Sequence, residues 1–581
     1  MPPDNRGRFK MHGPTTPLAQ ETHQDKYREQ GEDFREYGNR VASALTDTPE
    51  EFQAFRDDLL TQVTLPAGRI QKAAGSHRGV TMYNCFVSGE IADSFVSGPN
   101  NIMQMLTEAV TTMRLGGGIG YEFSTLRPKN SLIKKLGSKS SGPLAFMDMF
   151  DAGCGCVKSA GDRRGAQMGT FRVDHPDIMD FIHAKQGSGR FKNFNLSVLI
   201  TDKFMDCLRT GEPFPLMFQG ENYGYAEAAK IWDAIMRSTY DWAEPGVIFI
   251  DRMNDRNNLR YCEKISATNP CGEQPLPPYG ACLLGSINLT KLVLEGLNGR
   301  VFFDYPRLDA VVDRFVRALD NVVDRSIYPL EQQRLEALSK RRMGIGVTGL
   351  ANTIEALLGR PSYGDEDFLE IQDTIMRAIA LRAYRTSVEL AKEKGAFPLF
   401  DRDQYGAAGT FVSTLPESIQ DAIRKHGIRN SHLLSHAPTG TISLSADNVS
   451  SGIEPVFLHS YNRTIIMDDG PRNESVEDYG VRVFGIKGRT TEEVTVDQHI
   501  KVLGLATRWV DSAVAKTINV PESYPFEDFK KAYLQAYEAG AKGCTTFRTG
   551  GKLMGILTKK EEEKTPEACF IDLTTGKREC A

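Results

Sequence analysis

Apolar residues change their spacing along the chain, and each spacing predicts a different element. Residues 20–60 are polar and favour helices, with apolar positions spaced to fall on helical faces. These positions are Phe34, Val41, Phe52, Phe55 and Leu59. Residues 308–323 repeat aliphatic and aromatic side chains at spacings of three and four, which predicts an amphipathic helix. Residues 376–394 predict another helix, which should end at Gly395.

Short continuous apolar runs lie between such helices. Residues 193–200 and 246–251 are two of them, and both predict buried strands. Strands that alternate with helices over several hundred residues indicate an α/β fold with mostly parallel strands. The charged run at 559–564 predicts a solvated linker. We therefore expect an N-terminal helical segment (1–64), an α/β body (65–555) and a flexible C-terminal linker and tail (556–581).

Composition narrows the class of protein. The 581 residues are 40% hydrophobic and 25% charged, as in soluble globular proteins, and the net charge of −5 argues against a surface that binds nucleic acid. No apolar run reaches the length of a transmembrane helix, and the N-terminus does not have the apolar stretch of a signal peptide. We therefore expect a cytoplasmic protein whose ten cysteines form no structural disulfide framework. Because no Cys-x-x-Cys pair occurs, we expect no metal site.

The segment Asn269-Pro270-Cys271-Gly272-Glu273 carries the most distinctive chemistry. In an extended segment its amide, thiol and carboxylate would point to one side. Hydrogen-atom abstraction from a sugar needs such a trio: a sulfur that carries a radical, a carboxylate that takes a hydroxyl proton, and an amide that orients the substrate. The alternative is an ordinary turn, because Asn-Pro and Cys-Gly are common loop dipeptides.

Three glycine-containing stretches are candidates for nucleotide binding. Residues 344–349 match the dinucleotide-binding fingerprint, but they follow the polar residues 339–343 instead of a hydrophobic strand, so we expect no dinucleotide site there. Residues 161–169 form a basic, glycine-bounded loop that could fit around a base. A third stretch offers N–H groups and hydroxyls that could hold a phosphate. It consists of Pro438, Thr439, Gly440, Thr441, Ile442 and Ser443.

Together, these stretches resemble the catalytic subunit of ribonucleotide reductase, and specifically the adenosylcobalamin-dependent class II enzymes. The resemblance extends from about Leu65 to about Arg548, and its motifs occur in the family's order. They are residues 83–87, 116–127, 163–169, 269–276, 281–289, 341–346, 437–443 and 542–548.

The resemblance implies a ten-stranded α/β barrel with a central finger loop. Cys271 would lie at the tip of this loop and carry a thiyl radical. Glu273 would be the general base for the ribose 3′-hydroxyl, and Asn269 would hold substrate hydroxyls. Cys85 and Cys282 would be the pair that is oxidised to a disulfide in each turnover. Asn84 and the stretch 438–443 would bind the ribonucleotide substrate.

The resemblance also implies regulation and partners. Asp93 and Arg127 fall where the family binds a deoxynucleotide or ATP effector. Arg163, Arg164 and Gln167 would transmit the identity of the effector to the substrate site. We expect thioredoxin or glutaredoxin as the reductant, with Cys569 and Cys580 as a tail dithiol that relays electrons. A homodimer would fit an effector site at a subunit interface. The family's N-terminal ATP cone is about a hundred residues long, and because only 64 residues precede Leu65 we expect this chain to be without that regulatory module.

The source of the radical separates two readings. Class I catalytic subunits receive the radical from a metalloprotein through a pair of adjacent tyrosines near the C-terminus. No adjacent tyrosine pair occurs in this chain, and the corresponding region reads Cys544-Thr545-Thr546-Phe547. Adenosylcobalamin needs no such relay, so we expect it to be the cofactor. The alternative is a class I subunit with a degenerate relay.

Overall fold

The N-terminal helices belong to the main body of the molecule. The computed structural model describes residues 12–133, 137–157, 166–187, 189–296, 298–467 and 470–550, and the short strands 557–558, 569–571 and 578–580. Its first helices are α1 (Pro17–Tyr27), α2 (Phe34–Leu45) and α3 (Pro49–Leu60), which confirms the predicted helical segment. Capping boxes begin α2 and α3 at Asp33 and Thr48. Both helices pack against α11 (Tyr305–Arg325), so the segment shares one core with the body.

An eight-stranded sheet forms one half of the body. Its strand order is β13-β2-β3-β6-β7-β10-β21-β20. Strands β2 to β10 of this order are mutually parallel, whereas β21 runs antiparallel to β10 and β13 antiparallel to β2. The bounds are β13 (Ala281–Cys282), β2 (Cys85–Val87), β3 (Gly118–Glu122), β6 (Gln167–Arg172), β7 (Phe194–Ile200), β10 (Gly246–Phe249), β21 (Gly543–Arg548) and β20 (Thr517–Val520). The strand predicted at 193–200 is confirmed, and the one at 246–251 ends early because α10 (Ile250–Asp255) begins there.

A smaller sheet continues from the first. It contains β1 (Thr64–Pro66), β14 (Leu284–Asn288) and β17 (Gly344–Thr348), with β14 parallel to β17. Only Leu283 separates β13 from β14, so the chain passes directly from one sheet to the other. Beyond β17, parallel bridges join Ile345 to Leu434 and His436 to Val514, which lies three residues before β20. The chain therefore joins the two larger sheets at Leu283, and isolated bridges lead from β17 through Leu434 and His436 to Val514.

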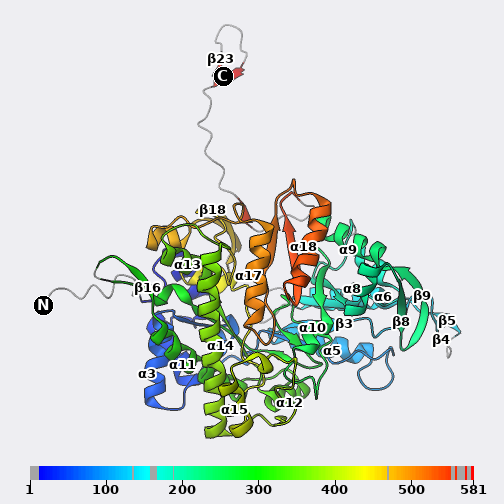
Figure 1. Ribbon diagram of the computed structural model, residues 1–581, viewed down its shortest axis with the longest axis horizontal. Coiled ribbons are helices and arrows are strands. Elements are labelled where there is room, and N and C mark those ends of the chain that lie inside the picture. Colours follow the sequence, from blue (N-terminus) through cyan, green and yellow to red (C-terminus); the bar gives the residue numbers. More distant parts are fainter. Residues whose placement is uncertain are drawn as a thin grey trace.

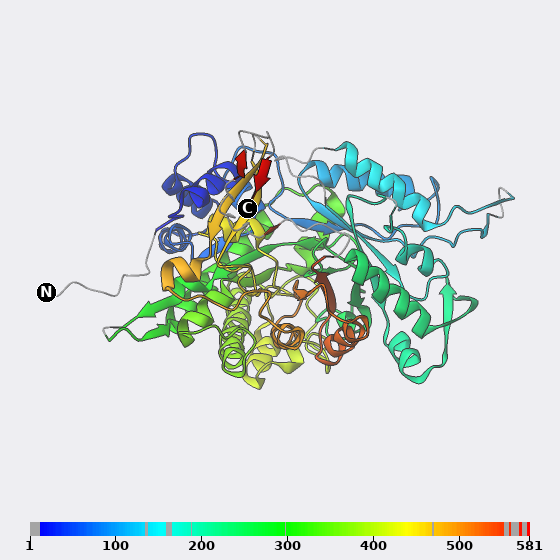
Figure 2. The ribbon, with the colours of Figure 1, turned by 90° about the horizontal axis from the view of Figure 1, so that it is seen from above.

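Helices cover the outer faces of both sheets (Figure 1). On one side lie α3, α11, α13 (Leu350–Leu358) and α14 (Glu366–Lys394), and α14 also packs against α17 (Val496–Arg508). On the other side lie α5 (Ile102–Arg114), α6 (Pro143–Cys156), α8 (Asp202–Thr210), α9 (Ala228–Trp242) and α18 (Phe526–Glu538). The view from above shows the strands between these two groups (Figure 2). The helices predicted at 308–323 and 376–394 are confirmed within the longer α11 and α14.

Several smaller elements complete the described residues. The helices are α4 (Gly68–Ala73), α7 (Ile178–Ile182), α12 (Glu331–Lys340), α15 (Glu417–His426) and α16 (Gly440–Ser445). Three peripheral hairpins pair β4 (Leu132–Ile133) with β5 (Ser138–Lys139), β8 (Pro213–Phe218) with β9 (Glu221–Glu227), and β15 (Val293–Glu295) with β16 (Val301–Phe303). None of the described helices combines the length and apolar character that a membrane span requires.

A short hairpin lies between the two sheets. Its strands are β11 (Ala267–Thr268) and β12 (Pro275–Leu276), and we call residues 267–276 the finger hairpin. Gly120 of β3 is so close that a Cβ there would lie 1.9 Å from the Thr268 carbonyl oxygen. Opposite β3, the Ala513 N–H donates to the Glu273 carbonyl. The finger hairpin therefore touches both halves of the body.

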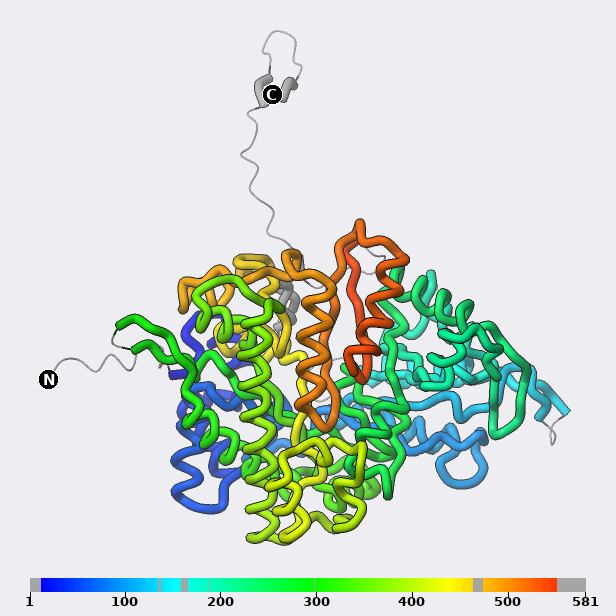
Figure 3. Tube along the Cα trace, viewed as in Figure 1, coloured from blue at the N-terminus to red at the C-terminus, as the bar shows by residue number. Residues whose placement is uncertain are grey.

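The C-terminal strands follow the body. Strand β22 (Leu557–Thr558) pairs with β18 (Ser460–Met467), which also pairs with β19 (Gly470–Glu477). Strands β23 (Cys569–Ile571) and β24 (Arg578–Cys580) form a separate antiparallel pair that places Cys569 opposite Cys580. The tube in Figure 3 shows α18, in red, beside α17, in orange. Both helices precede the C-terminal strands in the sequence.

Candidate active site

The finger hairpin turns sharply at its tip. The Asn269 carbonyl accepts the Gly272 N–H at 3.0 Å, and the Asn269 Oδ1 accepts the Gln274 N–H at 2.9 Å. The prediction of an extended segment was therefore wrong. Pro270 has a fixed φ that suits a turn, and Gly272 adopts a left-handed φ of 83°. The turn leaves Cys271 exposed at the tip and buries Asn269 and Glu273 on its flanks.

Glu273 is a buried carboxyl group, and no charged neighbour contributes to the shift of its pKa. Burial raises its pKa from 4.5 to about 7, and a hydrogen bond from Asn269 offsets part of that increase. Its Oε2 atom has no hydrogen-bond partner among the described residues. Near neutral pH the group can therefore exchange a proton, and one oxygen remains available for a ligand.

Two cysteines face each other beside this turn. Cys85 of β2 pairs directly with Cys282 of β13. Opposite residues of an antiparallel pair have Cα atoms about 4.5–5.5 Å apart, and this distance suits a disulfide. Burial raises the pKa of the Cys282 thiol well above its ordinary range, and negative charge on Cys85, Glu273 and Cys271 adds to the effect. The sheet register thus brings Cys85, which is distant in sequence, to Cys282, and Cys271 and Glu273 are close enough to influence the same thiol.

Glycines make this assembly sterically feasible. A Cβ at Gly118 would lie 3.2 Å from both the Cys85 sulfur and the Pro270 ring. On the opposite side, a Cβ at Gly344 would lie 2.4 Å from the Gln274 amide nitrogen. These glycines were missed as site residues, although the glycine-rich run 116–120 marks one of them. Residues 344–348 of the stretch 344–349 form strand β17 itself, where Gly344 and Gly346 allow close packing.

The candidate phosphate-binding stretch begins α16. Thr439 adopts a left-handed φ of 55°, and its Oγ1 accepts the Gly452 N–H at 2.7 Å. The Ser443 hydroxyl lies 2.9 Å from that of Ser451. These contacts hold the turn, while Pro438 and Gly440 remain exposed. The stretch directly follows His436, whose parallel bridge to Val514 ties it to the same edge as Ala513, the residue that contacts Glu273.

Two further buried polar atoms, on Asn84 and His436, have no hydrogen-bond partner among the described residues. The first is Oδ1 of Asn84, the residue adjacent to Cys85. The second is Nδ1 of His436, whose pKa burial lowers to about 4. Buried polar groups are normally satisfied, so these atoms indicate places where a polar ligand or water binds. Asn84 was predicted to bind substrate, whereas His436 was not among the predicted site residues.

Two of the residues predicted to act in effector recognition, Asp93 and Arg127, lie side by side. Arg127 donates from Nε to Asp93 at 2.8 Å, so these two residues form an ion pair. Gln167 begins β6, and its side chain is buried between Tyr121 and the Phe150 carbonyl. It is therefore part of the core. Arg163 and Arg164 lie outside the described residues, as do the side chains of Cys569 and Cys580.

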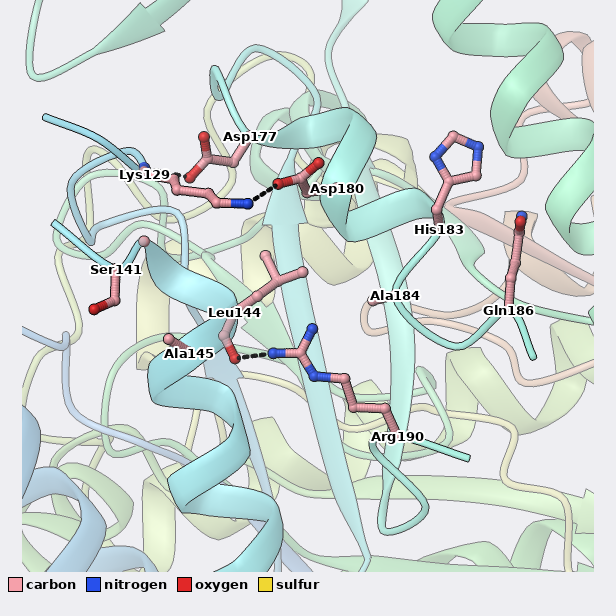
Figure 4. Close-up of a pocket in the computed structure, with 11 residues that line it drawn as sticks. Lys129, Ser141, Leu144, Ala145, Asp177, Asp180, His183, Ala184, Gln186 and Arg190 are labelled. Atoms are coloured by element: carbon pink, nitrogen blue, oxygen red, sulfur yellow. Dashed lines mark hydrogen bonds and ion pairs between the residues drawn. The ribbon is translucent and has the colours of Figure 1, made fainter. Parts of the chain in front are cut away.

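A cavity of about 390 Å³ lies between the start of α6 and α7 (Figure 4). Its wall includes Lys129, the first residues of α6, α7 and Arg190, and none of the three site cysteines. Lys129 and Asp180 face each other across one side, and Arg190 donates to the Leu144 carbonyl. This cavity is separate from the cluster around Cys271.

Known proteins share much of this chain's sequence. A family model described as "Ribonucleotide reductase, barrel domain" matches residues 83–478 and 484–547. The chain is 34% identical over 525 residues to the "Vitamin B12-dependent ribonucleoside-diphosphate reductase" of Mycobacterium tuberculosis (strain CDC 1551 / Oshkosh), covering 85% of this chain and 71% of the relative. It is 32% identical over 574 residues to the protein of the same name from Thermoplasma acidophilum, and the match covers 93% of this chain and 71% of that relative. It is 25% identical over 439 residues to a "Ribonucleoside-diphosphate reductase large chain" of Encephalitozoon cuniculi, covering 67% and 56%.

Proposed function

Because this chain belongs to the ribonucleotide reductase family, we propose a mechanism in which its own cysteine cluster converts ribonucleotides to 2′-deoxyribonucleotides. The reaction is vitamin B12-dependent, which the family's class II enzymes share, and the class I alternative is the weaker reading. The observation that carries the mechanism is the convergence of Cys271, Glu273, Cys85 and Cys282. The names of the two most similar relatives above favour diphosphate substrates.

The scaffold for this chemistry is a ten-stranded barrel. Five parallel strands, β2, β3, β6, β7 and β10, make one half. We assign the other half to β21, β20 with Val514, the segment 434–436, β17 and the continuous β13–β14. The bridges at Leu434 and His436 support this closure. The finger hairpin then fills the centre, with Cys271 at its tip.

The substrate lies between the hairpin tip and α16. The stretch 438–443 holds the phosphates, and Asn84 and Asn269 orient the ribose hydroxyls. The unpartnered Asn84 Oδ1 and Glu273 Oε2 support this placement, since both are buried acceptors beside the cysteines. A bound ribose supplies the hydroxyl donors that these atoms do not have within the described protein.

Cys271 abstracts hydrogen from the ribose. Adenosylcobalamin, when bound, supplies an organic radical by homolysis of its cobalt–carbon bond. With the cofactor bound, the Cys271 thiol would give its hydrogen atom to that organic radical. The Cys271 sulfur would then take the 3′-hydrogen and become a thiol again, which leaves the unpaired electron on the sugar. Glu273 accepts the 3′-hydroxyl proton, a role that suits a carboxyl group with a pKa near the working pH.

Cys85 and Cys282 supply the two electrons. The 2′-hydroxyl group leaves as water with the hydrogen of one thiol, and the hydrogen of the other thiol is added at the 2′-carbon. The two sulfurs are left as a disulfide, which the cross-strand pairing can accommodate. Cys271 regains its radical when it returns a hydrogen atom to the 3′-carbon, so only the Cys85–Cys282 pair needs to be reduced again.

The chain's residues leave access for a bulky cofactor. Cys271 and Asn195 are both exposed, so the sulfur can be reached from solvent. Beside Asn195 the wall carries small side chains: a Cβ at Gly246 would lie 3.0 Å from the Ser197 hydroxyl and 3.5 Å from that of Thr545. We assign this small-residue wall to the cofactor side of Cys271.

Regulation and reduction involve further partners. Asp93 and Arg127 bind a deoxynucleotide or ATP effector, and the loop that contains Arg163 and Arg164 relays its identity to the substrate site. When an effector binds, Arg127 and Asp93 would give up their ion pair and contact the effector instead. This change would be the first step in transmitting the identity of the effector to the substrate site. A homodimer would place the effector site at the subunit interface. Thioredoxin or glutaredoxin reduces the Cys569–Cys580 dithiol, which in turn reduces the Cys85–Cys282 disulfide.

The first test uses the purified chain without a second protein. We expect deoxynucleotide formation with adenosylcobalamin and a dithiol, and none without the cofactor. Adding dTTP, dGTP or dATP one at a time should change the preferred base, because effector coupling is typically about 1–3 kcal/mol. Activity that requires a separate metalloprotein and ignores cobalamin would contradict the mechanism, and an unchanged base preference would contradict the effector assignment.

Glu273→Gln should lower kcat by about 10²–10⁴-fold, the usual contribution of a general base. The wild-type kcat/KM should rise with pH towards a plateau above about 7, because only the deprotonated carboxyl group accepts a proton. The variant should not show this rise.

The contribution of Glu273 to folding stability should fall as pH rises, whereas kcat/KM should increase. The folded protein keeps the Glu273 proton between pH 4.5 and about 7, where the unfolded chain releases it, so this group makes stability fall as pH rises through that window. Thermal unfolding at pH 8 should therefore leave Glu273→Gln at least as stable as wild type. A clearly less stable variant would mean that the carboxylate is stabilised when charged.

A further inference from the structure

The finger hairpin is held at two carbonyl groups that flank Cys271. The Asn195 side-chain amide donates to the Pro270 carbonyl at 2.8 Å. The Ser435 hydroxyl donates to the Glu273 carbonyl at 2.9 Å. One of these carbonyls lies one residue before the radical-carrying sulfur, and the other two residues after it. We propose that Asn195 and Ser435 form a clamp that fixes the position of Cys271, and this role rests on the proposed radical function.

The two donors come from opposite halves of the body. Asn195 is on β7 of the eight-stranded sheet, next to Met168 of β6 in the register. Ser435 lies in the segment that bridges β17, where its N–H donates to the Ile345 carbonyl. The tip of the hairpin is therefore set relative to both halves. A change in either contact shifts the sulfur relative to a substrate bound by the other elements.

The Ser435 side of the clamp is braced by a buried carboxyl group. Asp511 accepts the N–H groups of Leu433 and Leu434 at 2.7 and 3.0 Å. Two residues later, the Ala513 N–H donates to the same Glu273 carbonyl that accepts from Ser435. Asp511 therefore ties together the two segments that hold this carbonyl. Ser435 is 1% exposed and packs against Gly344 and Gly346 of β17.

The Asn195 side is different because it is exposed. Asn195 faces the accessible space that also contains Cys271. An exposed asparagine contributes little to the stability of a sheet, and asparagine is disfavoured in strands. Its amide is nevertheless directed at the one carbonyl that precedes Cys271. This combination fits a positioning role better than a packing role.

Position matters strongly for hydrogen abstraction. Displacing a reacting group by about 1 Å can cost on the order of 10²-fold in rate. Asn195→Ala removes the donor without creating a buried cavity, so the protein should fold normally. Asn195→Asp keeps the shape but places an acceptor against the Pro270 carbonyl. Both variants should bind nucleotide with wild-type affinity and lower the rate of the chemical step by about 10–100-fold.

Single-turnover kinetics with enzyme in excess of substrate test the clamp. The rate constant reports the chemistry in each active molecule, whereas the amplitude reports the fraction of active molecules. We expect lower rate constants with full amplitudes for both Asn195 variants. We also expect a larger kinetic isotope effect with 3′-deuterated substrate, because abstraction becomes slower than the other steps. Ser435→Ala should show the same signature.

Asn193→Ala is the matched control. Asn193 lies two residues earlier and donates to the Asp151 carbonyl on α6 instead of the finger hairpin. This variant should keep the wild-type rate constant and isotope effect. The clamp is wrong if the Asn195 variants keep the wild-type rate constant, or if they lose only amplitude. Absence of cobalamin-dependent turnover in the wild type would instead contradict the proposed function, so the wild type is measured first.

Discussion

Replacing Cys271 by serine should abolish deoxynucleotide formation. The O–H bond of serine is much stronger than the S–H bond of cysteine, so the hydroxyl cannot take over the radical. Cys271 is the exposed sulfur at the tip of the finger hairpin, while Cys85 and Cys282 are committed to the opposed pair. Effector and substrate binding should persist, because the substitution removes no contact assigned to either ligand.

The matched control is Cys262→Ser. Cys262 is also exposed but is not part of the finger hairpin or the cysteine pair. This variant should retain wild-type turnover, measured as deoxynucleotide formed per enzyme with adenosylcobalamin and dithiothreitol. If Cys271→Ser keeps turnover within tenfold of wild type while Cys262→Ser is unaffected, another group carries the radical.

Loss of either tail cysteine should stop repeated turnover driven by thioredoxin. In the proposed mechanism each turnover leaves a disulfide between Cys85 and Cys282, and a protein reductant cannot reach the fully buried Cys282. A tethered dithiol can reach it at an effective concentration on the order of millimolar. Thr558 is held against β18, so 11 residues (569 − 558) separate it from Cys569. Extended, they span about 36–40 Å.

Dithiothreitol separates the two roles of the cysteines. A small dithiol can diffuse to the buried pair, so it should largely restore turnover in Cys569→Ser and Cys580→Ser. It should not restore Cys85→Ser or Cys282→Ser, because these variants no longer have the electron donors. Strands β23 and β24 place Cys569 opposite Cys580, as an exchangeable pair requires. Full thioredoxin-driven turnover in both tail variants would show that the tail thiols are incidental.

Several residues of the proposed site lower the folding stability of the protein. Glu273, Asn84 and His436 all have buried polar atoms without a partner among the described residues. Such atoms usually cost about 1–3 kcal/mol each when they remain unsatisfied. Such atoms at a proposed substrate site are expected where a ligand completes the hydrogen bonding. Substrate binding should therefore stabilise the fold as well as start the reaction.

The sequence by itself determined the local elements and the chemical groups. Apolar spacing located α11 and the end of α14, because a helix repeats its core-facing side every 3.6 residues whatever lies around it. The order of short motifs pointed to the family, and with it to Cys271, Glu273 and the pair Cys85–Cys282. Such groups can be read from sequence because the chemistry requires their residue types.

Only the tertiary structure decided how these groups meet. The extended reading of residues 269–273 failed because proline and glycine form a turn whose shape depends on contacts across the hairpin. The raised pKa of Glu273 comes from burial by residues that are distant in sequence. Cys85 meets Cys282 through strand register, and Asn195 and Ser435 reach the hairpin from separate halves of the body. No local pattern encodes such contacts, because sheet pairing and burial are properties of the whole chain.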